Sequence, residues 1–175
     1  MLRRAMLALT FPLIGCAEEL TPSGVTGPGV AVLNVSQLSF AAVVSGPMTK
    51  PVGCAPDVFA CGDAVVAGYG SGKYGYSITA FQRTAPSCGA YTATVTFSLE
   101  DASTLTLEES GIVCGPGKSF FATPGSSYGN PASGAGNWSV ISASGQFTGL
   151  SGDGTNTFRI AGAALSAVYT GELEN

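Results

Sequence analysis

Residues 91–99 of this 175-residue chain read YTATVTFSL, and their alternation restricts the fold more than any other feature. Every odd position in this stretch is apolar, and every even position carries a hydroxyl group. Because successive side chains of a strand point to opposite faces, a period of two predicts a half-buried β-strand. After residues 100–102, Leu105 and Leu107 continue the alternation, which predicts an antiparallel hairpin with a short turn.

The apolar faces of this hairpin also indicate its register. With a three-residue loop over 100–102, Phe97 lies opposite Leu105, and a slip by one residue would separate the two apolar faces. The same register places Cys88 opposite Cys114, at a cross-strand distance suited to a disulfide. A slip by two residues also aligns the faces, so the pattern favours this register without excluding others.

The rest of the chain has the pattern of short strands and no helical period beyond the first 20 residues. Clusters of Gly, Pro, Ser and Asp separate the strand-like segments. About eight short strands at this spacing predict an all-β domain with a single antiparallel β-barrel, for which a β-sandwich is the alternative. A barrel removes the exposed edges that invite aggregation. These further strand-like segments are 32–44, 64–69, 73–83, 118–122, 137–142, 155–160 and 163–173.

The N-terminal residues have the order of an export signal. Arg3 and Arg4 precede an apolar run over 5–14, which is too short to span a bilayer as a helix, since a span takes about 20 apolar residues. A small residue and a cysteine then follow, as at the end of a signal peptide. The four residues that end this region are Leu13, Ile14, Gly15 and Cys16.

This ending resembles the lipobox of bacterial lipoproteins. In that family the cysteine thiol receives a diacylglyceryl group, the signal is cut before it, and the new amino terminus is acylated. The resemblance implies a signal peptide over 1–15 and a membrane anchor at Cys16, whereas a buried cysteine in a terminal core element is the alternative. The family retains proteins with an aspartate after the cysteine at the inner membrane, so Ala17 implies the outer membrane.

The predicted domain follows a linker and carries an acidic charge. Residues 16–29 contain two prolines and three glycines without apolar periodicity, which predicts a flexible linker before a β domain over 30–175. Without Arg3 and Arg4 the chain has five Lys+Arg against eleven Asp+Glu, a net charge of 5 − 11 = −6. The five cations are scattered, and this argues against nucleic acid as a partner.

The predicted domain has four cysteines: Cys54, Cys61, Cys88 and Cys114. An exported protein meets an oxidising compartment, so an even number of cysteines predicts disulfides. Zinc is the alternative, but the nearest cysteines have six residues between them, and the chain has no histidine. The hairpin register selects Cys88–Cys114, which leaves Cys54 to pair with Cys61.

No residues predict catalysis or cofactor binding. Without histidine, the usual hydrolase arrangements lack their general base. The acidic pairs at 100–101 and 108–109 are interpreted as solvated turn and strand positions, and Asp153 with Gly154 as a turn, since one acidic residue makes no calcium site. Residues 70–75 match the dinucleotide fingerprint by letters, but a strand follows where that motif needs a helix. We therefore predict no metal and no cofactor.

A second resemblance concerns residues 144–173, SGQFTGLSGDGTNTFRIAGAALSAVYTGEL. Their glycine-punctuated strands and closing Tyr-Thr-Gly-x-Leu are similar to secreted bacterial proteins of the allene oxide cyclase or dirigent-like barrel group. The resemblance implies a barrel with an apolar cavity, in which polar residues of the plant enzymes position a ligand. None of their catalytic residues has a match here, so no activity is implied.

Aromatic residues are the candidates for lining such a cavity. Tyr74 and Tyr76 share one strand face with Ile78, and Trp138 shares another with Val140. Core packing is the alternative role for these side chains. The sequence therefore predicts a lipid-anchored barrel of the cell envelope that acts as a structural or binding module for a protein or a small apolar ligand. An envelope enzyme of the cyclase or isomerase type is the alternative.

Overall fold

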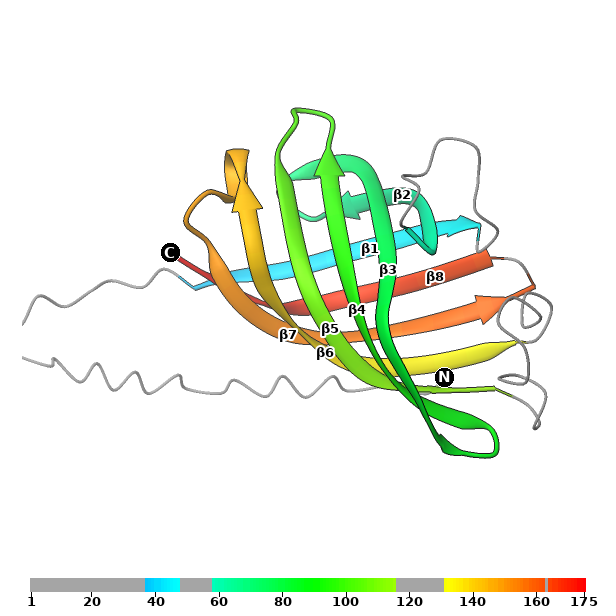
Figure 1. Ribbon diagram of the computed structural model, residues 1–175. Coiled ribbons are helices and arrows are strands. Elements are labelled where there is room, and N and C mark those ends of the chain that lie inside the picture. The colour runs from blue at the N-terminus through cyan, green and yellow to red at the C-terminus, as the bar shows by residue number, and fades with distance from the viewer. Residues whose placement is uncertain (1–36, 48–57, 116–130, 163) are drawn as a thin grey trace, which may run out of the picture. The chain divides into compact units, whose positions relative to one another are not determined.

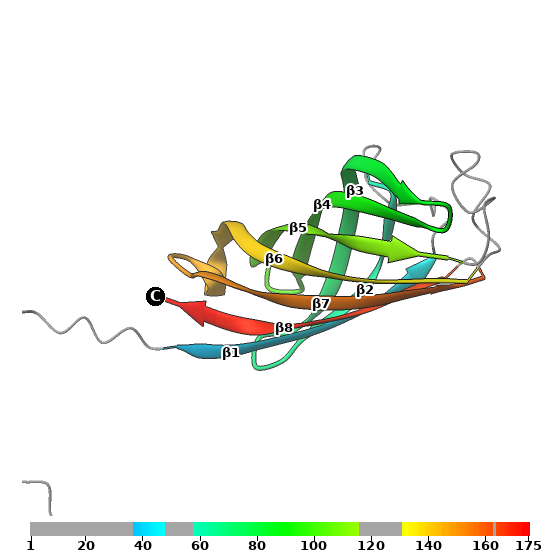
Figure 2. The same cartoon turned by 90° about the horizontal axis from the view of Figure 1, so that it is seen from below.

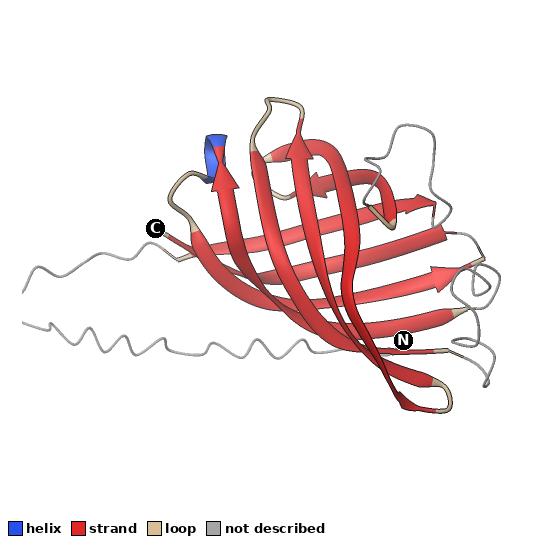
Figure 3. Cartoon of the chain, viewed as in Figure 1, coloured by secondary structure: helices blue, strands red, loops and turns tan. Residues whose placement is uncertain are grey.

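The computed structural model describes residues 37–47, 58–115, 131–162 and 164–175, all within one compact unit. They form strands almost throughout, with one short 3₁₀ helix (Figures 1 and 3). No helix in this part of the chain is long and apolar enough to cross a membrane. The elements are β1 (Leu38–Pro47), β2 (Ala60–Val66), β3 (Gly70–Ala85), β4 (Cys88–Leu99), β5 (Thr104–Cys114), β6 (Ala132–Ser144), η2 (Gly145–Phe147), β7 (Ser151–Ala161) and β8 (Ala164–Glu174).

The eight strands close into an antiparallel barrel. Each strand pairs with the next along the chain, and β8 pairs with β1, with Leu38 opposite Leu173 and Pro47 opposite Ala164 (Figure 2). The prediction of an all-β antiparallel barrel is thus confirmed, and the alternative of a sandwich is wrong. The two hairpin arms and the seven further strand-like segments make nine predicted strands. Eight of them overlap β1 to β8, and the ninth, 118–122, lies outside the described residues.

The β4–β5 hairpin has the register expected from its pattern. Phe97 lies opposite Leu105, and Cys88 lies opposite Cys114. At the turn, the backbone N–H of Ala102 donates to the carbonyl of Leu99 at 3.0 Å, and Ala102 has a φ of 68°. A tight turn that ends in a left-handed residue is the usual form of a three-residue hairpin loop.

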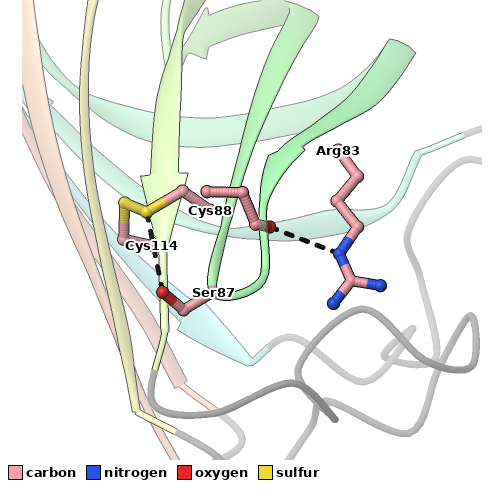
Figure 4. Close-up of a disulfide and its surroundings, with 5 residues drawn as sticks. Arg83, Ser87, Cys88 and Cys114 are labelled. Atoms are coloured by element: carbon pink, nitrogen blue, oxygen red, sulfur yellow. Dashed lines mark hydrogen bonds between the residues drawn. A yellow bond between two sulfur atoms is a disulfide. The ribbon is translucent and has the colours of Figure 1, made fainter.

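A disulfide joins the far end of this hairpin. Cys88 and Cys114 are bonded with a Cα–Cα distance of 4.1 Å (Figure 4), so this predicted bridge is confirmed. The adjacent Ser87 hydroxyl lies 4.0 Å from the Cys88 sulfur. Cys61 is disulfide-bonded too, whereas Cys54, its predicted partner, lies outside the described residues.

The barrel turns its apolar faces inward. Aromatic rings in its interior make edge-to-face contacts: Phe40 lies 5.0 Å from Trp138 and 6.2 Å from Phe97, measured between ring centroids. At the end of the barrel that carries η2, the buried ring of Phe147 packs on Tyr69 at 4.5 Å. From Thr92 to Ser98 the outward positions of β4 are three threonines and a serine, as the alternation predicts.

Glycines make room for the largest of these side chains. Trp138 on β6 lies opposite Gly154 on β7, which lies opposite Gly171 on β8. A Cβ atom added to Gly154 or Gly171 would lie 2.6 Å or 2.5 Å from Cζ2 of Trp138, closer than atoms approach in proteins. The indole therefore fits only because β7 and β8, the next two strands of the sheet, have no side chain at this level.

Candidate functional site

A carboxyl group lies inside the barrel. Glu109, near the middle of β5, has no exposed surface, although its neighbour Glu108 is exposed on the outer face. Buried acidic residues are rare unless other groups compensate their charge. Glu109 is therefore the most unusual buried residue of the described barrel and the centre of its candidate site.

Three tyrosines from three other strands donate hydrogen bonds to this carboxyl. The Tyr91 hydroxyl on β4 donates to Oε1 at 2.5 Å, and the Tyr169 hydroxyl on β8 donates to Oε2 at 3.0 Å. Tyr76 on β3 reaches Oε1 at 3.5 Å, which makes it a weak third donor. Glu109, these three tyrosines and Asn156 on β7 are the five residues of what we name the Glu109 cluster.

The register of the strands explains how the cluster assembles. A single row across the sheet runs from Tyr91 through Gly111, Gly136 and Asn156 to Tyr169. Because β5 and β6 contribute only glycines to this row, the polar side chains of β4 and β7 meet above them. A Cβ atom on Gly136 would lie 2.8 Å from Asn156 Oδ1 and 2.9 Å from the Tyr91 hydroxyl. Gly136 is thus needed for this meeting.

Asn156 is the member of the cluster whose polar groups are unused. Its side chain is 2% exposed, and neither Nδ2 nor Oδ1 has a partner at hydrogen-bonding geometry. The amide nevertheless lies close enough to Glu109 and Tyr91 to favour the charged form of each. Buried amides without hydrogen bonds are uncommon in folded proteins, and each one calls for an explanation.

Burial determines the ionisation of the cluster. Desolvation raises the pKa of the Glu109 carboxyl above its ordinary value, and the hydrogen bonds from the three tyrosines, together with the nearby Asn156 amide, oppose this rise without cancelling it. Desolvation, followed by the charge of Glu109, raises the pKa of the three cluster tyrosines. In the described part of the chain the cationic side chains, Lys73, Arg83 and Arg159, are all exposed. None of them compensates the carboxyl charge inside the barrel.

This ionisation predicts how stability depends on pH. Because the pKa of Glu109 is higher in the folded than in the unfolded chain, the folded chain holds the proton more tightly. The contribution of Glu109 to stability is therefore fully present below its unfolded pKa of about 4.3, and it falls as pH rises through the folded pKa. Glu109→Gln should remove this fall, whereas the outward-facing Glu108→Gln should retain it.

Urea denaturation of the two variants and of the unchanged protein at intervals from pH 4 to pH 8 measures the difference. The free energy of unfolding of Glu109→Gln should gain on that of the unchanged protein as pH rises. If the two proteins kept a constant difference across this range, Glu109 would not hold its proton more tightly in the barrel.

The three aromatic residues predicted to line a cavity have different positions. Tyr76 belongs to the Glu109 cluster. Tyr74 is 2% exposed, its hydroxyl has no hydrogen-bond partner, and burial, with the nearby Asp63, raises its pKa to about 12. Trp138 is a core residue, whose indole N–H donates to the carbonyl of Thr155 at 3.0 Å. The structure therefore brings Tyr76 into the Glu109 cluster and places Trp138 next to it, opposite Glu109 in the β5–β6 ladder, whereas Tyr74 lies elsewhere in the core.

Tyrosine-to-phenylalanine variants should separate these roles. Tyr74→Phe removes a buried hydroxyl without a partner, so we expect stability to be unchanged or raised by about 1 kcal/mol. Tyr91→Phe removes the 2.5 Å bond to Glu109, and we expect a loss of about 1.5–3 kcal/mol, as for hydrogen bonds to charged groups. Thermal and urea unfolding of both variants at neutral pH would measure this. Equal losses of stability in the two variants would show that the hydrogen bond from Tyr91 to Glu109 does not stabilise the fold.

The interpretation of Glu109 as a solvated residue is wrong, although the sequence held the signal that corrects it. Leu105 and Leu107 define the inward face of the strand, and two residues further along the same face is Glu109. Glu100 and Asp101 lie in the exposed turn after β4, as predicted. The turn predicted at Asp153 and Gly154 is wrong, because both residues lie within β7 and pair with β6 on one side and β8 on the other.

The other sequence motifs form no cofactor-binding or metal-binding arrangement in the described residues. The glycines of the 70–75 stretch lie in β3, where no helix follows them. Asp153 lies on the outer surface of β7, opposite Glu172 of β8. Among the described residues, no group of three or more acidic, cysteine or histidine side chains is arranged to hold a metal ion.

Comparisons with protein-family models, with characterised proteins and with solved structures give no match for this chain. The function therefore has to be argued from the Glu109 cluster and from the sequence that precedes the barrel.

Proposed function

We propose that this protein is a lipid-anchored binding module of the cell envelope, whose barrel takes up a small ligand at the Glu109 cluster. The observation that carries the proposal is the buried Glu109 carboxyl, which tyrosine hydroxyls on three other strands surround. Placing a carboxyl in an apolar interior costs several kcal/mol, and apolar residues of similar volume often stabilise a core as well or better. A binding role accounts for such a group.

The unused amide of Asn156 supports binding over a purely structural role. A polar network that only fixed the strand register would be expected to have all its members hydrogen-bonded, because a partly satisfied network is less stable than an apolar core. Asn156 instead has a buried donor and a buried acceptor without partners beside Glu109. A ligand that reaches the cluster would satisfy both.

The location rests on the leader. The Arg3–Arg4 start, the apolar run over 5–14 and the Leu13-Ile14-Gly15-Cys16 ending support export and acylation of Cys16, with the linker over 16–29 between lipid and barrel. Several acyl chains hold a protein to a membrane stably, whereas one chain holds it marginally. Ala17 supports the outer membrane in a cell that has one.

Metabolic labelling with a radioactive fatty acid tests the anchor. The unchanged protein should carry label and sediment with membranes, and Cys16→Ala should give an unlabelled, unprocessed or soluble form. Label retained on Cys16→Ala would disprove the attachment. Cys61→Ala is a poor control because Cys61 is disulfide-bonded, so Ser23→Ala in the linker is the matched variant.

Native mass spectrometry tests the binding role. The protein extracted from its own membranes should carry an additional small mass, which Glu109→Gln should lose and Glu108→Gln should keep. If the unchanged protein and Glu109→Gln carried the same bound species, the Glu109 cluster would not be the binding site.

An envelope cyclase or isomerase is the second candidate function. The observation that favours it is the 2.5 Å bond between Tyr91 and a carboxyl whose pKa is raised, since a protonated carboxylic acid at neutral pH can act as a general acid. The eight-stranded barrel also suits the resemblance to the allene oxide cyclase group. In this case Glu109→Gln should bind the extracted ligand but leave it chemically unchanged.

A further inference from the structure

The Glu109 cluster lacks a positive charge. In the described part of the barrel the side chains around Glu109 are three phenols, the Asn156 amide and the Trp138 indole, which are all uncharged groups at neutral pH, and every described lysine and arginine is exposed. Hydrogen bonds from neutral hydroxyls stabilise a carboxylate, but they do not neutralise its charge in an apolar interior. A cationic ligand would supply the missing charge.

The hydrogen-bonding capacity that remains in the cluster consists mostly of acceptors. Each tyrosine hydroxyl has one proton, which it donates to Glu109, and keeps its oxygen lone pairs. Asn156 Oδ1 accepts no hydrogen bond, and a carboxylate has about four acceptor sites, of which the tyrosines fill three. These acceptors converge on one small region, so they suit a group with several N–H donors.

We infer that the ligand of the Glu109 cluster is an organic ammonium ion, a protonated amine on a compact apolar body. Its N–H groups would donate to the Glu109 carboxylate, to Asn156 Oδ1 and to a tyrosine oxygen. The inference rests on the proposed function, which supplies the site, and it adds the chemical class of the ligand. The apolar body would pack on the aromatic side chains around the cluster, such as the partly buried Phe158, whose ring lies 5.6 Å from that of Tyr91.

Other ligand classes fit these groups less well. An anion would meet the Glu109 carboxyl within a chain whose exported part has a net charge of −6. A neutral amide could pair with both polar groups of Asn156, but it would leave the carboxyl without a counter-charge. The positive charge of an ammonium ion is also attracted to the faces of the tyrosine rings.

Three fluorinated probes of similar size distinguish these classes: 4-fluorobenzylamine, 4-fluorobenzyl alcohol and 4-fluorobenzoate. Titration of the full chain in detergent at pH 7, followed by the ¹⁹F line width of each probe, gives its Kd. We expect the amine to bind at least about tenfold more tightly than the alcohol, a difference of about 1.4 kcal/mol. Glu109→Gln should lose this preference, and Glu108→Gln should retain it.

A second variant keeps the test independent of the stability of Glu109→Gln. Asn156→Leu removes polar atoms that have no partners, so the barrel should fold, as circular dichroism would check, and the affinity for the amine should fall several-fold. Binding of the alcohol or the benzoate that depends on Glu109, without preference for the amine, would overturn the ligand class while leaving the site in place. No Glu109-dependent binding of any probe would count against the site itself.

Discussion

Trp138→Ala is expected to lower the free energy of unfolding by about 3–5 kcal/mol, the range for removing a large aromatic side chain from a core. The indole is 2% exposed, packs edge-to-face on Phe40 and donates to the carbonyl of Thr155. Gly154 and Gly171 lie beside it, so β7 and β8 have no side chain at this level that could move into the space that it leaves. Urea denaturation at neutral pH measures the loss.

Two variants serve as controls for this result. Trp138→Phe keeps part of the packing and loses the N–H bond, so its stability should lie between those of the other two proteins. Ile141→Ala, on the same strand but 55% exposed, should change stability by less than about 0.5 kcal/mol. If Trp138→Ala lost less than about 1 kcal/mol of stability but no longer bound the ligand, Trp138 would line a cavity instead of stabilising the core.

Removal of the Cys88–Cys114 bridge is expected to cost about 2–5 kcal/mol. The bridge spans 26 residues, and a loop of that length corresponds to about 3.5 kcal/mol of chain entropy in the unfolded state. The double variant Cys88→Ser with Cys114→Ser should show this cost in urea denaturation, and Ser87→Ala, beside the bridge, should not.

Peptide mapping without reduction tests the complete pairing. It should recover Cys88 linked to Cys114 and Cys54 linked to Cys61. A peptide that joins Cys54 to Cys88 would contradict both the pairing and the hairpin register from which it was predicted.

The hairpin could be predicted because all of its information is local. The alternation over 91–99 and the two leucines after the turn are close in sequence, and a short loop leaves few registers in which their faces coincide. The disulfide followed from the same register. For the barrel, only the fold class could be predicted. The pairing of β1 with β8 that closes it joins segments at opposite ends of the domain, and no local pattern indicates it.

The site was less predictable, for two physical reasons. The phase of Leu105 and Leu107 placed Glu109 inward, but a buried acid is rare enough that the solvated interpretation prevailed. Its partner Tyr169 lies 60 residues away in sequence, and no local pattern relates the two. Bulges add a further difficulty: Ile78 shares the phase of Tyr74 and Tyr76, yet it is 41% exposed where the β3–β4 register shifts and β3 extends past β2.

The pairing of β1 with β8 has a consequence for how the barrel is made and how it can be rearranged. The closing ladder joins residues 173 − 38 = 135 positions apart, so during synthesis the sheet has two open edges until its last strand is available. The same strand delivers Tyr169 to Glu109, and a chain cut before it would therefore lack both a sealed sheet and a complete site. Conversely, Leu38 and Leu173 are neighbours, so a linker could join the two ends and new ends could be opened in the turn over 67–69. Such a circular permutant would keep every ladder, but β2 would replace β8 as the strand that completes the barrel last.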